Sequence, residues 1–182
     1  MKLLVVISIG PQDFIAAARR SHHLWFGSWL LSELSRAAAS SLNQQKAKLP
    51  FPSPEKPEDL YPNSDFNVAN KITAIVACDD VRQIIDQVKT AVIQRLKDLM
   101  KDAFGKVRRK FQRDTAKKQV LDLVEFFAAA VPIQDDLSDY RKLWNRQVAF
   151  SQRGRIRGNS LKLLGAKTCR NLLWTVNIIG HT

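Results

Sequence analysis

An apolar run near the N-terminus stops abruptly and leads straight into a long helical pattern. Leu3 to Ile9, LLVVISI, is rich in β-branched side chains and almost uniformly apolar, which predicts a central strand covered on both faces. Gly10 and Pro11 then end the strand. The stretch from Lys2 to Arg36 therefore predicts a buried strand that is followed by a helix over Asp13 to Ala39. The apolar side chains expected along one side of that helix are Ile15, Ala18, Trp25, Trp29, Leu30, Leu34 and Ala37.

A proline-rich stretch separates this helix from the next strand. Five prolines between Leu49 and Asn70 exclude a helix through most of that stretch, and Leu49 to Phe51 is predicted as a short edge strand. Lys71 to Ala77, KITAIVA, alternates enough between side-chain types to predict a second strand.

The strongest helical pattern follows that strand. Asp79 and Asp80 suit the start of a helix, because carboxylates are stabilised near the positive end of the helix dipole. Apolar side chains then keep helical spacing for about six turns, up to an expected interruption at Gly105. They are Val81, Ile84, Ile85, Val88, Val92, Leu96, Leu99, Met100 and Ala103. Leu121 to Val131 fits a strand or a helix by its length, and Leu137 to Phe150 predicts a further helix.

With a strand at Leu121 to Val131, the order of elements is strand, helix, strand, strand, helix, strand. This order predicts an α+β fold of the ferredoxin-like, split βαββαβ type, with helices on one face and a C-terminal helix and irregular tail beyond it. Polymerase palms and many RNA-binding domains share this topology, so the fold alone does not identify the function.

Charge and cysteine content exclude several classes of protein. The net charge of +12 is concentrated near the C-terminus, since nine basic residues and no acidic residue follow Asp139. Cys78 and Cys169 stand alone without a CxxC pair, which argues against a four-cysteine zinc site and a disulfide framework and fits a reducing cytoplasm. No apolar run approaches the ~20 residues of a membrane span, so no membrane partner is expected.

Two segments are candidate ligand sites. The turn at Gly10, Pro11 and Gln12 could present backbone donors to a nucleotide phosphate, although a simple tight turn is favoured because no glycine-rich loop or following lysine is present. A basic segment could contact RNA phosphates, with a solvated charge run as the alternative. Its candidate residues are Lys106, Arg108, Arg109, Lys110 and Arg113.

Other chemistry-bearing residues are assigned structural roles. The adjacent His22 and His23 point about 100° apart on a helix and cannot grip one metal ion as an i, i+4 pair would. The aspartates at 79 and 80 are explained by a helix start. The aromatic residues Trp25, Phe26 and Trp29 are predicted to pack in the core or against another subunit rather than to stack on bases. No catalytic residue and no metal site are predicted.

Four separated segments resemble one protein family in the same order. They are SIGPQDFIAAARR, LWFGSWLLSELS, FPSPEKPEDLYPNSDFNVANKITAIV and LVEFFAAAVPI, within residues 1–150. They resemble the N-terminal palm region of the large, Cmr-type, polymerase-like Cas subunit of type III-B CRISPR effector complexes. The chain departs from the family by lacking one apolar residue between Pro11 and Gln12, and by carrying His22 and His23 where the family has a polar residue followed by Asp.

The resemblance implies a first palm-like domain over residues 1–150 with a proline-rich insertion at 43–70, and a strand at Leu121 to Val131. In the family, the full protein condenses ATP into cyclic oligoadenylates with divalent metal ions held by a Gly-Gly-Asp-Asp turn. That motif and an HD nuclease pair are missing from this sequence. The implied partners are other effector subunits, guide RNA and target RNA. No cofactor and no turnover are expected for this chain alone.

The tail departs from the family and leaves alternatives open. Gln147 to Thr182 has no acidic residue, and residues 151–182 are expected to be a disordered or out-of-frame tail, with an RNA-binding arm as the alternative. For the whole chain the runner-up is a free-standing basic ferredoxin-like RNA-binding module, which rarely carries so long a proline-rich insertion. A third interpretation is a secreted protein. The stretch from Gly10 to Asp13 argues against it, because this stretch interrupts the apolar run before any cleavage site for a signal peptide.

Overall fold

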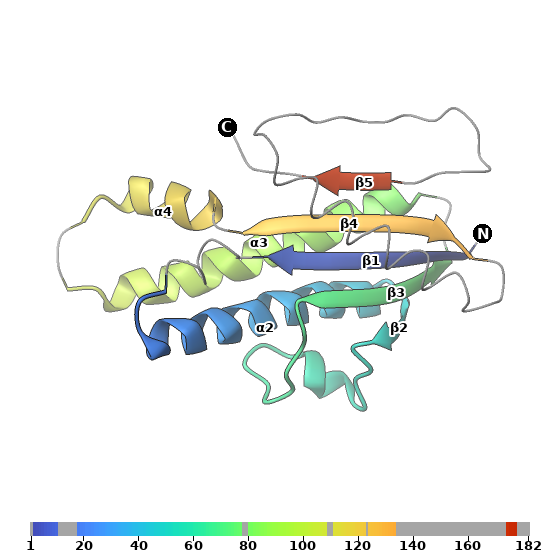
Figure 1. Cartoon of the computed structure of the whole chain (residues 1–182), viewed down its shortest axis with the longest axis horizontal. Coiled ribbons are helices and arrows are strands. Elements are labelled where there is room, and N and C mark those ends of the chain that lie inside the picture. Colours follow the sequence, from blue (N-terminus) through green and yellow to red (C-terminus); the bar gives the residue numbers. More distant parts are fainter. Residues whose placement is uncertain are drawn as a thin grey trace.

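Strand β1 (Lys2–Gly10) lies in the middle of a five-stranded antiparallel sheet. The computed structural model describes residues 2–10, 18–77, 80–108, 111–122, 124–133 and 174–177. β1 pairs with β3 (Lys71–Ala77) on one side and with β4 (Glu125–Pro132) on the other, while β2 (Lys48–Phe51) and β5 (Trp174–Asn177) form the edges (Figure 1). The strand order β2-β3-β1-β4 confirms the predicted ferredoxin-like arrangement.

Both faces of β1 are buried, as its uniform apolar sequence predicted. Side chains alternate between the faces of a strand. Leu3, Val5, Ile7 and Ile9 belong to the main core, together with side chains from both long helices. Leu4 and Val6 are buried on the opposite face, where Ile75 and Ile133 pack against them.

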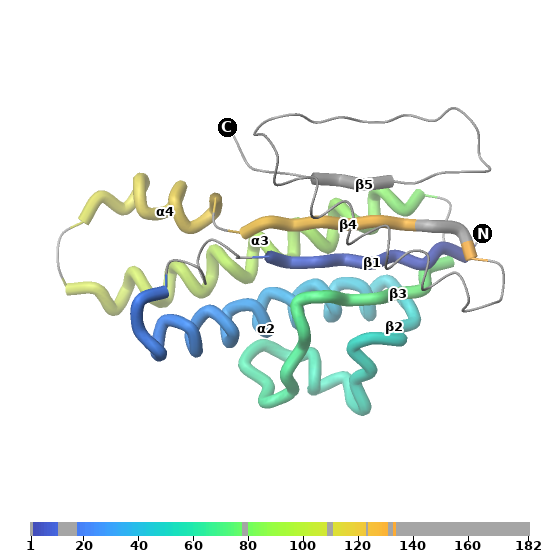
Figure 2. The backbone as a smooth tube through the Cα atoms, viewed as in Figure 1, coloured from blue at the N-terminus to red at the C-terminus, as the bar shows by residue number. Residues whose placement is uncertain are grey.

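The two long helices, α2 (Ser21–Gln44) and α3 (Val81–Lys106), cover one face of the sheet and pack against each other (Figure 1). The colours of Figure 2 show that they run in opposite directions along the strands. On α3 the buried side chains are Val81, Ile85, Val88, Val92, Leu96 and Met100, which confirms the predicted stripe up to Met100; Ala103, also predicted, is exposed.

The α2 helix is covered on two sides, so it buries polar side chains as well as apolar ones. Its apolar side faces the sheet through Leu34, Ala38 and Leu42. Part of its polar side is covered by the proline-rich segment that contains the short 3-10 helix η1 (Pro57–Leu60). The helix begins only at Ser21, because Arg20 before it has an extended backbone conformation. The predicted start at Asp13 lies outside the described residues, but Ala18 precedes the helix and was wrongly placed in it.

Two element boundaries differ from those predicted. Gly105 does not interrupt α3, which continues to Lys106. A glycine lowers the stability of a helix by only about 1 kcal/mol relative to alanine, and the packing of the buried stripe of α3 offsets this loss. The strand predicted from Leu121 begins instead at Glu125, because residues 113–122 form helix α4 (Arg113–Asp122). Arginine and lysine are good helix formers, and Val120 and Leu121 pack on the core at the end of this helix.

The remaining expectations concern the C-terminal part. Trp174–Asn177 pairs with β4 as strand β5, which the expectation of a tail without structure did not include. The helix predicted at Leu137 to Phe150 lies outside the described residues, as does the rest of the tail.

Ile85→Ala tests the packing of α3 on the sheet. Ile85 is 1% exposed, so truncation should lower the free energy of unfolding by about 2 to 5 kcal/mol, measured by urea denaturation. Ile93→Ala is the matched control, because Ile93 lies on the same helix but is only partly buried, and its loss should be clearly smaller. Equal losses for the two variants would contradict the described packing.

Candidate functional site

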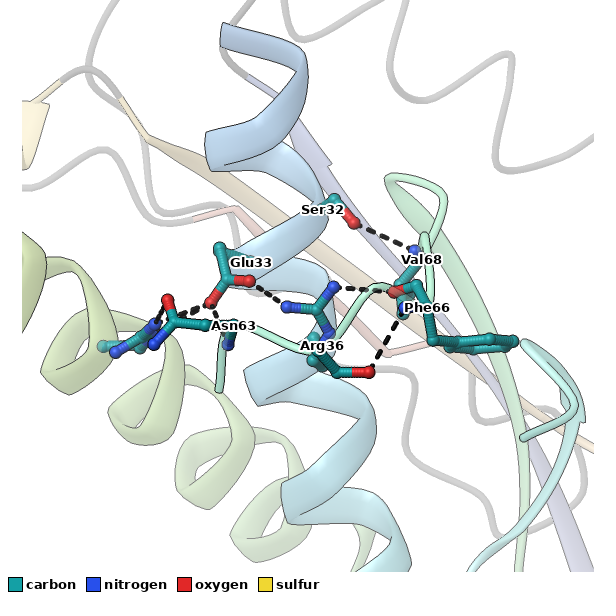
Figure 3. A network of polar contacts seen from close by, with 8 residues as sticks. Ser32, Glu33, Arg36, Asn63, Phe66 and Val68 are labelled. Atoms are coloured by element: carbon teal, nitrogen blue, oxygen red, sulfur yellow. Dashed lines mark hydrogen bonds and ion pairs between the residues drawn. The ribbon is translucent and has the colours of Figure 1, made fainter. Parts of the chain in front are cut away.

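A buried carboxylate on α2 collects polar contacts from three parts of the chain. Glu33 is 1% exposed, and its Oε2 accepts hydrogen bonds from Arg95 Nη2 at 2.7 Å and from Arg95 Nε at 3.3 Å. Its Oε1 accepts a hydrogen bond from Arg36 Nη1, one turn further along α2. Glu33 therefore links α2 to α3 through the guanidinium group of Arg95, while Arg36 pairs with it within α2 (Figure 3).

The same network holds the proline-rich segment against α2. The backbone N–H of Asn63 donates to Glu33 Oε2 at 3.3 Å, and Arg36 Nη2 donates to the carbonyl of Phe66 at 2.6 Å (Figure 3). Ser32 Oγ accepts from the N–H of Val68 at 2.9 Å. Asn63 adopts a left-handed backbone conformation that asparagine tolerates well, and its side chain accepts from Arg95 Nη2 at 3.0 Å.

The electrostatics of this cluster indicate a structural role. Burial lowers the pKa of Arg36, and the neighbouring Arg95 charge lowers it further, while Asp65 raises it. Glu33 supplies the counter-charge that makes two guanidinium groups tolerable in this position. Both carboxylate oxygens are already occupied, and the Ser32 hydroxyl of the network is buried against the N–H of Val68, so we assign the cluster no catalytic chemistry.

Sequence reasoning missed this cluster entirely. A glutamate and an arginine three residues apart on a helix are normally a solvent-exposed pair, and their partner Arg95 is 62 residues away from Glu33. One available signal was the position of Glu33, which directly precedes the core residue Leu34 on α2.

Asp80 acts as the N-cap of α3. Its Oδ1 accepts hydrogen bonds from the backbone N–H groups of Arg82 at 3.0 Å and Gln83 at 3.3 Å, which confirms the predicted helix start. A shallow surface hollow lies beside it, lined by α3 residues that include Arg82, Asp86 and Thr90. Asp79 lies outside the described residues. Among the described residues, no group of three His, Cys, Asp or Glu side chains is placed to hold a metal ion.

The predicted phosphate-binding turn is only partly described. Gly10 is the last residue of β1 and pairs with Glu125, whereas Pro11 and Gln12 lie outside the described residues. A Cβ atom built on Gly10 would lie 3.5 Å from Glu125 Oε2. A carboxylate this close to the turn disfavours an anionic phosphate electrostatically. Nucleotide binding at this turn stays a prediction.

The predicted RNA-contact residues cluster where α3 gives way to α4. Lys106, Arg108 and Arg113 are exposed, and Arg109 and Lys110 lie outside the described residues. Phe104 and Phe111 meet edge to face with ring centroids 5.0 Å apart, so the start of α4 is held against the end of α3.

Two of the aromatic residues of α2 do not pack in the core. Trp25 is 70% exposed and Phe26 is 44% exposed, so core packing is wrong for both, whereas packing against another subunit stays a prediction. The ring centroids of Phe26 and Trp29 lie 5.7 Å apart, while His22 and His23 are exposed at the first turn. The error arose because the first turns of α2 extend past the ends of the strands, where there is no sheet for their apolar side chains to cover (Figure 1).

Comparisons with known proteins identify one family. The family model for the N-terminal part of the CRISPR-associated protein Cmr2 matches residues 4–101, which extend from β1 through most of α3. A search of curated proteins finds none that matches the chain. In the part of the chain that the structure describes, no helix is long and apolar enough to cross a membrane.

Glu33→Ala tests the buried network. The substitution leaves Arg36 and Arg95 without their buried counter-charge, so the free energy of unfolding should fall by about 3 to 5 kcal/mol in urea denaturation. In a double-mutant cycle with Arg95→Ala, the two losses should add to more than the loss of the double variant. Asp98→Ala removes an exposed carboxylate from α3 and should cost less than about 0.5 kcal/mol. A Glu33→Ala loss as small as that of the control would contradict the role assigned to the network.

Proposed function

Because the chain belongs to the family defined by the N-terminal part of the CRISPR-associated protein Cmr2, we propose that it serves as the palm-like N-terminal region of a type III-B effector large subunit. Such complexes defend the cell against foreign nucleic acid by means of a guide RNA. The family match carries this proposal, because it includes the central strand, the proline-rich segment and nearly all of both long helices.

The proposed role is structural and RNA-binding rather than catalytic. The ferredoxin-like sheet is compatible with a polymerase palm, although the same topology serves many functions. Synthesis of cyclic oligoadenylates from ATP by the full-length family needs carboxylates that hold divalent metal ions. The sequence has seven glycines, none adjacent to another, and therefore no Gly-Gly-Asp-Asp turn. We infer that this chain alone does not transfer nucleotides.

The proposed RNA contact lies on the basic segment between α3 and α4. Residues 106–118 carry seven basic side chains and one acidic side chain, Asp114. The described cations of this segment are exposed, as phosphate contacts require, and Asp114 lies 3.8 Å from Lys117. The partners proposed for the chain are the other subunits of the effector complex, guide RNA and target RNA, in the cytoplasm.

The absence of nucleotidyl transfer can be tested directly. The purified chain, incubated with ATP and magnesium, should yield no oligoadenylate in a chromatographic assay, because no acidic turn is present to hold the metal ions. Product that disappears in an Asp79→Ala, Asp80→Ala double variant would instead assign a catalytic role to residues we regard as the start of α3.

The RNA contact can be tested by its salt dependence. The chain should bind an unstructured RNA oligonucleotide with an affinity that falls as salt rises. Replacing Lys106 and Arg108 by glutamine should reduce the slope of log affinity against log salt concentration by about 1.4, since each contact with a single strand contributes about 0.7. Lys46→Gln with Lys48→Gln is the matched control, because both lysines are exposed beyond the opposite end of α2. A slope that is unchanged in the Lys106, Arg108 variant would contradict the contact.

A further inference from the structure

The first turn of α2 and the last turn of α3 lie at the same end of the molecule. The two helices run in opposite directions and are joined by the Glu33 to Arg95 ion pair. Ser21 precedes Glu33 by twelve residues, and Lys106 follows Arg95 by eleven. At 1.5 Å per residue, both helices therefore extend roughly 16 to 18 Å past the ion pair in the same direction. Figure 1 shows both ends lying beyond the strands.

This shared end is defined by residues 19–26, 104–108 and 111–113, and we call it the basic end. Arg19 and Arg20 lead into α2, and they add to the exposed cations Lys106 at the end of α3, Arg108 in the connection and Arg113 at the start of α4. No acidic residue occurs between Arg19 and Ser32 in the sequence. The end of α2 therefore continues the positive surface of the α3 to α4 connection.

Apolar side chains are exposed on the same end. Trp25 is 70% exposed, Leu24 is 47% exposed and Val107 is 46% exposed. Exposed tryptophan is unfavourable in water, since indole is among the largest apolar groups in proteins. An exposed indole at the same end as clustered cations offers a stacking surface and phosphate ligands together.

We propose that the basic end binds a single-stranded polynucleotide, with Trp25 stacked on a base while Arg19 and Arg20, which precede α2, and cations of the α3 to α4 connection contact the phosphates. Stacking on exposed aromatic rings within a positive surface is how proteins bind single strands without reading their sequence. The charge favours this ligand over an apolar protein partner. The proposal rests on the RNA contact proposed above, and adds to it α2, Trp25 and the preference for unpaired bases.

The first measurement compares Trp25→Ala with the wild-type chain in binding to oligouridylate, by fluorescence anisotropy across a salt series. Loss of the stacked ring should weaken Kd about 5- to 150-fold at every salt concentration and leave the salt slope unchanged. Trp25→Phe, which keeps an aromatic face, should retain most of the affinity. Tyr61→Ala is the control, since Tyr61 is 57% exposed but lies in the proline-rich segment, and its affinity should equal that of the wild type.

Two further readouts separate stacking from a structural effect. Binding of oligouridylate should quench indole fluorescence in the wild type and quench it less in Trp25→Phe, although that variant still binds. Circular dichroism should give the Trp25 variants the same unfolding midpoint as the wild type, because the side chain is exposed. Oligothymidylate should compete with oligouridylate, whereas the same length of duplex should compete poorly, because its bases are already stacked.

The outcomes distinguish this proposal from the one on which it rests. Weaker binding by Trp25→Ala at every salt concentration, together with a reduced slope in the Lys106, Arg108 variant, supports both. A reduced slope in that variant with unchanged affinity in Trp25→Ala overturns the stacking site and leaves the phosphate contact standing. An unchanged slope in the Lys106, Arg108 variant overturns the phosphate contact itself. Equal affinity for duplex and single strand overturns the proposed preference for unpaired bases.

Discussion

The burial of β1 on both faces is the constraint on which the rest of the structure depends. Val5 and Val6 are adjacent, point to opposite faces and are both 0% exposed, so neither face of the central strand is left in water. Each backbone edge of β1 is also paired, with β3 on one side and β4 on the other. The strand can therefore exist only after residues from distant parts of the chain have assembled around it.

A second constraint concerns charge. Burying Glu33, Arg36 and Arg95 between two helices is favourable only if their polar atoms are paired, because the cost of removing charges from water is high. Backbone groups of Asn63 and Phe66 supply part of this pairing, so the proline-rich segment becomes part of the packing of α2. From the sequence, the proline-rich segment could only be predicted to lack a helix through most of its length. In the structure, the polar side of α2 holds this segment in place.

At the basic end, no described strand packs against the two long helices. The helices are longer than the strands they cover, so the first turns of α2 and the last turns of α3 carry side chains that the sheet does not bury (Figure 1). In that position cations and an indole remain available to a ligand, and the chain belongs to the family of the N-terminal part of the CRISPR-associated protein Cmr2. The proposed phosphate contact and the proposed base stacking would both use this overhang.

The sequence by itself determined β1, β3 and α3, because each has a local pattern that the fold preserves: a uniform apolar run, an alternating run and a helical stripe that begins at the Asp80 cap. It also determined the family, through segments that extend beyond any one element. Only the tertiary structure decided the Glu33 network and the exposure of Trp25. The first depends on a partner 62 residues away, and the second depends on where the sheet ends relative to α2. Periodicity specifies which residues share a side of a helix, but what covers that side is a property of the whole chain.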